Sequence, residues 1–99
     1  MRLYQRLPPK DEARIVGKQL LRSGTSVGAN YRAACRARSR AEFIAKLGIV
    51  LEESDETVFW LELLLETGLL SHERLEPLVK EANELTSIFV SSLCTAKKA

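Results

Sequence analysis

Basic side chains recur at helical spacing through the first half of the chain. At about 100° per residue, Arg14 and Arg32 fall at the same angle on a helix. Lys18 and Arg36 lie about 40° further round, and Arg22 lies about 80° round. Such a stripe could contact phosphates, in binding that is independent of base sequence and weakened by salt. The candidate nucleic-acid-binding residues are Lys18, Arg22, Arg32, Arg36, Arg38, Arg40 and Lys46.

The charges are unevenly distributed along the sequence, which offers a second interpretation of this stripe. Residues 13–51 hold eight basic residues and one acidic residue, whereas residues 52–84 hold ten acidic residues and two basic ones. The arginines could therefore pair with carboxylates of the same or a neighbouring subunit. Aromatic residues for base stacking are almost absent from the helix that carries the basic stripe, with Tyr31 the only one nearby. The sequence leaves both interpretations open.

Carboxylates at helical spacing supply the partners for an interhelical contact. Glu53 and Glu56 lie three residues apart, so they share one face of a helix. We expect Arg22 or Asn30 to pair with Glu53 or Glu56, which fixes register more surely than it stabilises. The candidate interhelical polar residues are therefore Asn30, Glu53 and Glu56. Asp55 lies near the apolar line of the same helix, and we expect it to be partly buried.

No residue pattern predicts an enzyme. The single histidine, His72, has a leucine three residues before it, so the Glu-x-x-His motif of helical di-metal sites is absent. No nucleophile and base are evident together, and the GTSVG stretch lacks the Lys-Ser/Thr ending of a phosphate-binding loop. The sequence therefore predicts a non-enzymatic protein with no catalytic residues, no metal site and no cofactor.

The cysteines and the apolar content bound the cellular setting. Cys35 and Cys94 form no CxxC pair, and we expect both to be reduced thiols buried as small apolar residues. No signal-peptide pattern and no apolar stretch of transmembrane length is present. These features predict a cytoplasmic protein that does not associate with a membrane.

Apolar residues at steps of three and four predict three helices in a single domain over residues 1–99. We expect the helices at about 11–37, 40–67 and 72–95, with a frayed tail after them. Ser39 and Glu42 form a capping box, and Gly68 is a C-terminal stop signal. Pro77 should lie in the first turn of the last helix, where its missing N–H matters little.

The small-residue cluster at 23–28 makes the first of these helices ambiguous. The stretch SGTSVG is typical of a loop when it is read alone. With its flanks, it could instead form a helix face at which Gly24 and Gly28 let another helix approach closely. Each glycine would lower helix stability by about 1 kcal/mol relative to alanine, so packing would have to compensate.

The stretch from Arg22 to Leu64 resembles the protein family encoded in the intervening sequences of bacterial 23S rRNA genes. The matching features are Arg22-Ser23, Ser26-Val27, Asn30, Arg38-Ser39 with Glu42-Phe43, and Glu53 with Glu56. The family is a four-helix-bundle family and is similar to the accessory variability proteins of diversity-generating retroelements. The resemblance implies one continuous helix over 11–37 and a homopentamer with a central channel. It also implies a basic outer surface that binds nucleic acid and a reverse transcriptase.

Two departures from the family pattern change these expectations. Only residues 1–7 precede Pro8, where family members carry a full helix. Many members also have Ala-Glu-Gly where this chain has Arg32-Ala33-Ala34, so a role for that glutamate does not transfer. We therefore predict an all-α, up-and-down antiparallel bundle of three long helices plus a short N-terminal remnant of a fourth, assembled as an oligomer.

Two functions follow as expectations. In the first, a homo-oligomer, expected to be a pentamer, binds RNA or DNA, or a reverse-transcriptase-like protein, through its basic face. In the second, the chain is a structural or adaptor assembly with no nucleic-acid contact.

Overall fold

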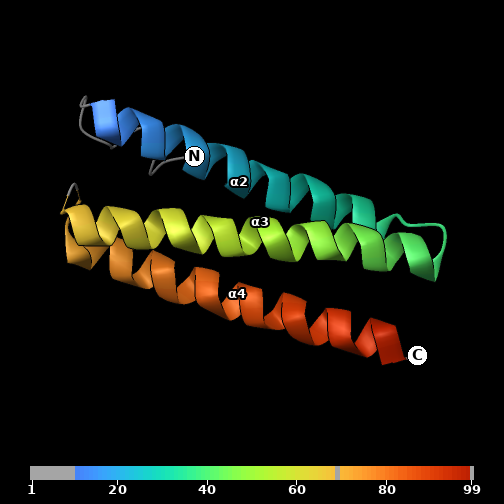
Figure 1. Cartoon of the computed structure of the whole chain (residues 1–99). Helices are drawn as coiled ribbons and strands as arrows, with labels where there is room; N and C mark the ends of the chain where they lie inside the picture. The colour runs from blue at the N-terminus through green and yellow to red at the C-terminus, as the bar shows by residue number, and fades with distance from the viewer. Residues whose placement is uncertain (1–10, 69, 99) are drawn as a thin grey trace.

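Three long α-helices make up the computed structural model, which describes residues 11–68 and 70–98 (Figure 1). They are α2 (Asp11–Cys35), α3 (Arg40–Thr67) and α4 (His72–Lys98). Each runs antiparallel to the next, and the body measures about 46 × 19 × 16 Å. The all-α, up-and-down prediction is therefore confirmed. The expected remnant of a fourth helix falls in residues 1–10, outside the described part of the chain.

Helix α2 is continuous through the small-residue cluster, as the resemblance implied. Its hydroxyl groups bond within the helix: the Thr25 Oγ1 lies 2.8 Å from the Leu21 carbonyl oxygen, and the Ser23 Oγ lies 3.3 Å from that of Leu20. Gly28 does not serve a close approach within the chain, because an added Cβ there would meet no atom within 4 Å. Ser23 is the small residue of this cluster that allows a close approach, since its side chain is fully buried against α3.

Helix α2 ends at Cys35, two residues before the predicted boundary. The Arg36 and Ala37 N–H groups donate to the Ala33 and Ala34 carbonyls, at 3.2 and 3.0 Å. These bonds span three residues, which tightens the last turn and ends the helix.

Helix α3 begins and ends where its capping residues predict. The Ser39 Oγ accepts a hydrogen bond from the Glu42 N–H at 3.1 Å, and the Arg38 N–H donates to the Glu42 Oε2 at 3.2 Å. At the other end Gly68 has φ 70°, the left-handed conformation that glycine adopts without strain. The capping box and the glycine stop are confirmed.

The Ser39 cap provides the first testable prediction. Replacing Ser39 with alanine leaves the Glu42 N–H without its acceptor, so we expect a loss of about 1 kcal/mol in the free energy of unfolding. Urea denaturation at one protein concentration measures it. Ser91→Ala, at an exposed site inside α4, is the control and should not destabilise the protein. Equal losses at the two positions would contradict the assignment of Ser39 as the cap.

Helix α4 starts at the predicted residue, but the position of Pro77 and the C-terminal end of the helix differ from the prediction. It begins at His72, so Pro77 lies in the second turn rather than the first, and the Glu73 carbonyl has no proline N–H to accept. The helix continues to Lys98, so the prediction of a frayed tail that starts at Thr95 is wrong for residues 95–98. The physical reason is Arg40 of α3, whose guanidinium donates to the Ala96 and Lys97 carbonyls at 2.7 and 2.9 Å and so satisfies the last turn.

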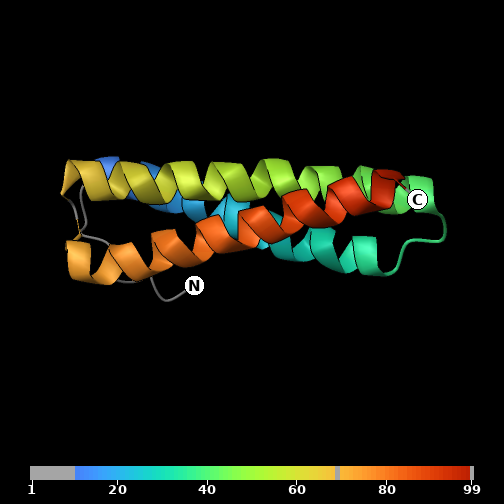
Figure 2. The ribbon, with the colours of Figure 1, turned by 90° about the horizontal axis from the view of Figure 1, so that it is seen from below.

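The core consists of two clusters on the side of α3 that faces the other two helices. The first joins all three helices near the α3–α4 connection and comprises Val16, Leu20, Leu61, Leu64 and Leu75. The second comprises Leu47, Val50 and Phe89, with Val27 of α2 packed against it. Figure 2 shows α3 as a ridge with α2 and α4 both to one side of it. Tyr31 of α2 contacts Phe89 of α4, with ring centroids 5.8 Å apart.

Three predictions of burial are wrong. Cys35 and Cys94 are both exposed, because they lie on the outer sides of α2 and α4. Asp55 is exposed as well, and its neighbour Ser54 takes the inward position. The Ser54 hydroxyl is satisfied there by the Thr86 hydroxyl at 2.6 Å. Within the described ranges, no helix is long and apolar enough to cross a membrane.

Candidate functional site: a polar seam and a basic end

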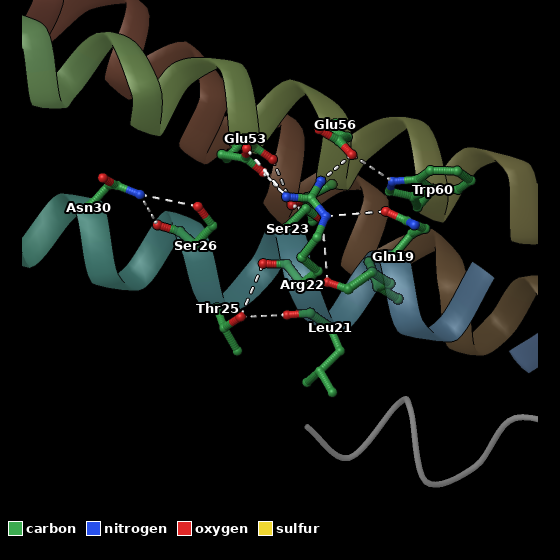
Figure 3. Close-up of polar contacts among 12 residues, drawn as sticks. Gln19, Leu21, Arg22, Ser23, Thr25, Ser26, Asn30, Glu53, Glu56 and Trp60 are labelled. Atoms are coloured by element: carbon green, nitrogen blue, oxygen red, sulfur yellow. Dashed lines mark hydrogen bonds and ion pairs between the residues drawn. The ribbon is translucent and has the colours of Figure 1, made fainter. Parts of the chain in front are cut away.

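Arg22 lies at the centre of a polar seam between α2 and α3 (Figure 3). Its Nη1 lies 3.2 Å from the Glu53 Oε2, and its Nη2 donates to the Glu56 Oε1. The Arg22 Nε donates to the Gln19 Oε1 at 3.2 Å, within α2. Because Glu53 and Glu56 are three residues apart on one helix, a single guanidinium can reach both carboxylates.

Trp60 completes this cluster on the α3 side. It is half-buried against the core, and its indole N–H donates to the Glu56 Oε1 at 3.3 Å. Glu56 therefore accepts from two donors, and the guanidinium of Arg22 is the stronger influence. The hydrogen bonds from Arg22 and Trp60 together lower the pKa of the Glu56 carboxyl. The hydrogen bond between Arg22 and Glu56 also raises the pKa of Arg22. Phe59, beside Trp60 in the sequence, is 54% exposed on the outer side of α3.

The seam continues along α2 with smaller polar groups. The Thr57 hydroxyl lies 3.0 Å from the Ser23 Oγ and 2.8 Å from the Glu53 carbonyl oxygen. The Asn30 amide donates to the carbonyl and hydroxyl oxygens of Ser26, at 3.0 and 3.1 Å. Asn30 thus bonds within α2, whereas Arg22 is the residue that bridges to Glu53 and Glu56. The seam holds the two helices in register. Its two carboxylates accept hydrogen bonds from Arg22 and Trp60, and neither of them bonds to a hydroxyl group that could act as a nucleophile.

The depressed pKa of Glu56 predicts a pH dependence of stability. The pKa of Glu56 is lower in the folded chain than in the unfolded chain, so its ionised carboxylate stabilises the fold. This contribution is fully present when the pH is above the unfolded-state pKa of about 4.3. It is lost as the pH falls through the folded-state pKa. We expect Glu56→Gln to lower the free energy of unfolding at about pH 7, and its difference from the wild type to shrink towards about pH 3. Urea denaturation across this range measures the difference. Glu66→Gln, at the exposed end of α3, is the comparison, and the same pH profile at both sites would contradict the prediction.

A second feature, the basic end of the bundle, forms where α2 ends, α3 begins and α4 ends (Figure 1). We define it as Arg32, Arg36, Arg38, Arg40, Lys97 and Lys98, all exposed, together with the half-buried Lys46. Residues 32–46 and 97–98 contain these seven cations and one carboxylate, Glu42. That carboxylate accepts from the Arg38 N–H. The bonds from Arg40 to the α4 carbonyls hold the last turn of α4, and with it Lys97 and Lys98, against this end.

The seven residues singled out in the sequence do not form one continuous line. Five of them lie in the basic end, and Arg22 is engaged by Glu53 and Glu56. Lys18 is exposed in the first half of α2, towards the opposite end of the molecule. Lys97 and Lys98 were missed because the tail was expected to fray. Basic residues are stabilising in the last turn of a helix, because they lie near the negative end of its dipole. This preference was the signal in the sequence that could have indicated a helix as far as Lys98.

Comparisons with known proteins agree with this fold. The family model described as 23S rRNA-intervening sequence protein matches residues 1–91. The chain is also similar to a crystal structure titled as a protein with unknown function from the S23 ribosomal protein family of Bacteroides thetaiotaomicron. That relative has 42% sequence identity and a TM-score of 0.84, over 93% of this chain and 82% of the relative. No curated protein matches. The chain therefore belongs to the 23S rRNA-intervening sequence protein family.

Proposed function

We propose that this chain is a non-enzymatic homo-oligomer of the cytoplasm that binds RNA or DNA through its basic end. The observation that carries the proposal is the convergence of seven cations, from three helices and from the connection between α2 and α3, on one end of the bundle, against one carboxylate. Exposed cations release condensed counterions when they contact phosphates, and this release drives binding without reading bases. Five copies is the assembly size that the family resemblance implies.

The aromatic residues favour contact with the backbone of the nucleic acid rather than with its bases. Two aromatic residues lie in or next to the stretch 32–46: Tyr31, whose ring packs against Phe89, and Phe43, which is partly buried against the core. Proteins that grip unpaired bases stack them on exposed aromatic side chains. We therefore expect affinity to follow the density of phosphates and to vary little with base sequence.

A specific observation favours the second function, a structural or adaptor assembly. Arg22, the residue in the middle of the predicted stripe, is already paired with Glu53 and Glu56 and is not free for a phosphate. If the cations of the basic end were paired in the same way with carboxylates of other subunits, no nucleic-acid surface would remain. A reverse-transcriptase-like protein, which the resemblance implies, would be an alternative partner for the same basic end.

The test compares nucleic-acid binding by the wild type and by the double variant Arg32→Ala/Arg36→Ala. Fluorescence anisotropy with labelled RNA and DNA of several sequences, over a range of salt concentrations, gives the affinity and its salt slope. We expect weaker binding to all sequences alike and a slope smaller by about 2, roughly one per lost phosphate contact.

The matched control removes the same charge from the other end of α4. Arg74→Ala/Lys80→Ala changes two exposed cations that lie among acidic residues, and it should leave binding nearly unchanged. The adaptor function is favoured instead if Arg32→Ala/Arg36→Ala reduces the mass of the oligomer while binding to RNA stays as weak as before.

A further inference from the structure

Helix α4 runs past its apolar core before it ends. Phe89 is its last buried residue, and Leu93, one turn further on, is partly buried against the same cluster. Beyond Leu93 only Ala96 is half-buried, and the other residues as far as Lys98 are exposed. The last turn of a helix also has carbonyl groups with no partner inside the helix, so an end without packing frays. The end of α4 therefore needs a contact from another element to stay helical.

Arg40, the first residue of α3, supplies that contact. Its Nε lies 2.7 Å from the Ala96 carbonyl oxygen, and its Nη2 lies 2.9 Å from that of Lys97. We call these two hydrogen bonds the Arg40 clamp. Figures 1 and 2 both place the end of α4 at the end of the molecule where α3 starts. Among the described residues, the Ser54–Thr86 bond is the only other side-chain hydrogen bond between α3 and α4, so the clamp alone holds this end by polar contact.

The clamp makes Arg40 less available to a phosphate than the other cations of the basic end. Two of its donors are directed at carbonyl oxygens, and a phosphate that took them would have to displace both bonds. These carbonyls also form the negative end of the α4 dipole, which offsets part of the positive charge of the guanidinium. Lys97 and Lys98 differ, because both are exposed and neither forms an ion pair with a residue that the structure describes.

We propose that Arg40 is a positioning residue for nucleic-acid binding, because it holds the last turn of α4 where Lys97 and Lys98 contact phosphates. Arg40 acts through the two lysines and makes no phosphate contact of its own. In a frayed end the two charges would spread over many conformations, and ordering them on binding would cost conformational entropy. The clamp removes that cost before the nucleic acid arrives. This inference rests on the proposed function and names the residue on which two of its seven cations depend.

The two roles open to Arg40 differ in what they require of its side chain. The clamp requires two donors fixed in one plane, which the guanidinium has and the ammonium of lysine lacks. A phosphate contact requires the positive charge, and lysine supplies this as a point charge. Arg40→Lys therefore keeps the charge and weakens the clamp, so this one substitution separates positioning from direct contact.

The main test measures binding by Arg40→Lys in two backgrounds, the wild type and Lys97→Ala/Lys98→Ala. Fluorescence anisotropy with a labelled DNA duplex over a range of salt concentrations gives the affinity and its salt slope. In the wild type, we expect Arg40→Lys to reduce the slope by about 2 and the affinity by about tenfold per lost contact at about 0.1 M salt. In Lys97→Ala/Lys98→Ala, the same substitution should change neither quantity, because the lysines through which it acts are absent. Wild-type binding by Arg40→Lys, or an equal loss in both backgrounds, overturns the inference.

A second measurement reports on the clamp without nucleic acid. Amide hydrogen exchange over residues 92–98, followed by mass spectrometry, measures how often this end of α4 opens. We expect faster exchange there in Arg40→Lys than in the wild type, and circular dichroism checks that the helices are otherwise kept. Arg74→Lys, at an exposed site near the start of α4, is the matched control and should change neither the exchange nor the binding. Unchanged exchange over 92–98 in Arg40→Lys also overturns the inference.

The failures of the two proposals are distinguishable. If Arg40→Lys changes neither exchange nor binding while Arg32→Ala/Arg36→Ala weakens binding, the positioning role is wrong and the proposed function stands. If Arg40→Lys speeds the exchange over 92–98 while the wild type shows no salt-dependent binding, the clamp holds the end of α4 but the nucleic-acid function is wrong, and the inference fails with it.

Discussion

Replacing Leu64 with alanine should destabilise the chain by about 3–5 kcal/mol, the largest effect that we expect from one substitution. Leu64 is fully buried in α3, in the cluster where Leu20 of α2 and Leu75 of α4 also meet. The substitution removes apolar contact with both neighbouring helices and leaves a cavity that three long helices cannot close. A domain of this size has a free energy of unfolding of about 5–15 kcal/mol, so such a loss approaches the lower end of that range.

Denaturation in urea at a fixed protein concentration measures this loss, because association adds to the apparent stability. The control is Val90→Ala, at an exposed site on α4, which should change the free energy of unfolding by less than about 0.5 kcal/mol. A loss below about 1 kcal/mol in Leu64→Ala would mean that this cluster is not the core of the molecule.

Replacing Ser23 with leucine should lower the stability by about 1–3 kcal/mol or more through overpacking. Ser23 is fully buried between α2 and α3, and its Oγ lies 3.0 Å from the Thr57 hydroxyl. A leucine there would push the two helices apart next to the Arg22–Glu53 and Arg22–Glu56 contacts, which depend on their spacing. We therefore expect the substitution to weaken the polar seam as well as the packing.

Ser23→Ala separates the two contributions. It keeps the small volume and removes only the hydroxyl, while Thr57 retains the Glu53 carbonyl as an acceptor. Its loss should be about 1 kcal/mol or less. If alanine proves as disruptive as leucine, the hydrogen bond rather than the volume governs this position. Thermal unfolding followed by circular dichroism distinguishes these outcomes.

The polar seam gives a physical meaning to most of the residues that carry the family resemblance. Arg22 and Ser23 on α2 meet Glu53, Glu56 and Thr57 on α3 across one interface. This interface is polar and partly exposed, so it supplies alignment between the helices more than it supplies stability. The seam is therefore a structural signature, and the candidate binding surface lies elsewhere, at the basic end.

The sequence by itself determined helices α3 and α4 and the two ends of α3. Apolar periodicity locates these two helices, since a helix needs only local spacing to show which of its faces is buried. Periodicity left the small-residue cluster at 23–28 open, and the structure shows that α2 runs through it. Ser39, Glu42 and Gly68 locate the ends of α3 because caps act within a few residues of the helix terminus. The sequence also narrowed the polar contact between the helices to Arg22 or Asn30 with Glu53 or Glu56, because the two glutamates share one face of their helix.

Only the tertiary structure decided which cations gather. Lys97 and Lys98 are more than 50 residues from Arg40 in the sequence, and the bonds from Arg40 to the carbonyls of α4 bring them to one end. The structure also removed Arg22 from the stripe by pairing it across the helices. Helical periodicity gives the face of a residue on its own helix, whereas the height at which two helices pass each other depends on packing between distant segments. That relative height placed the basic end.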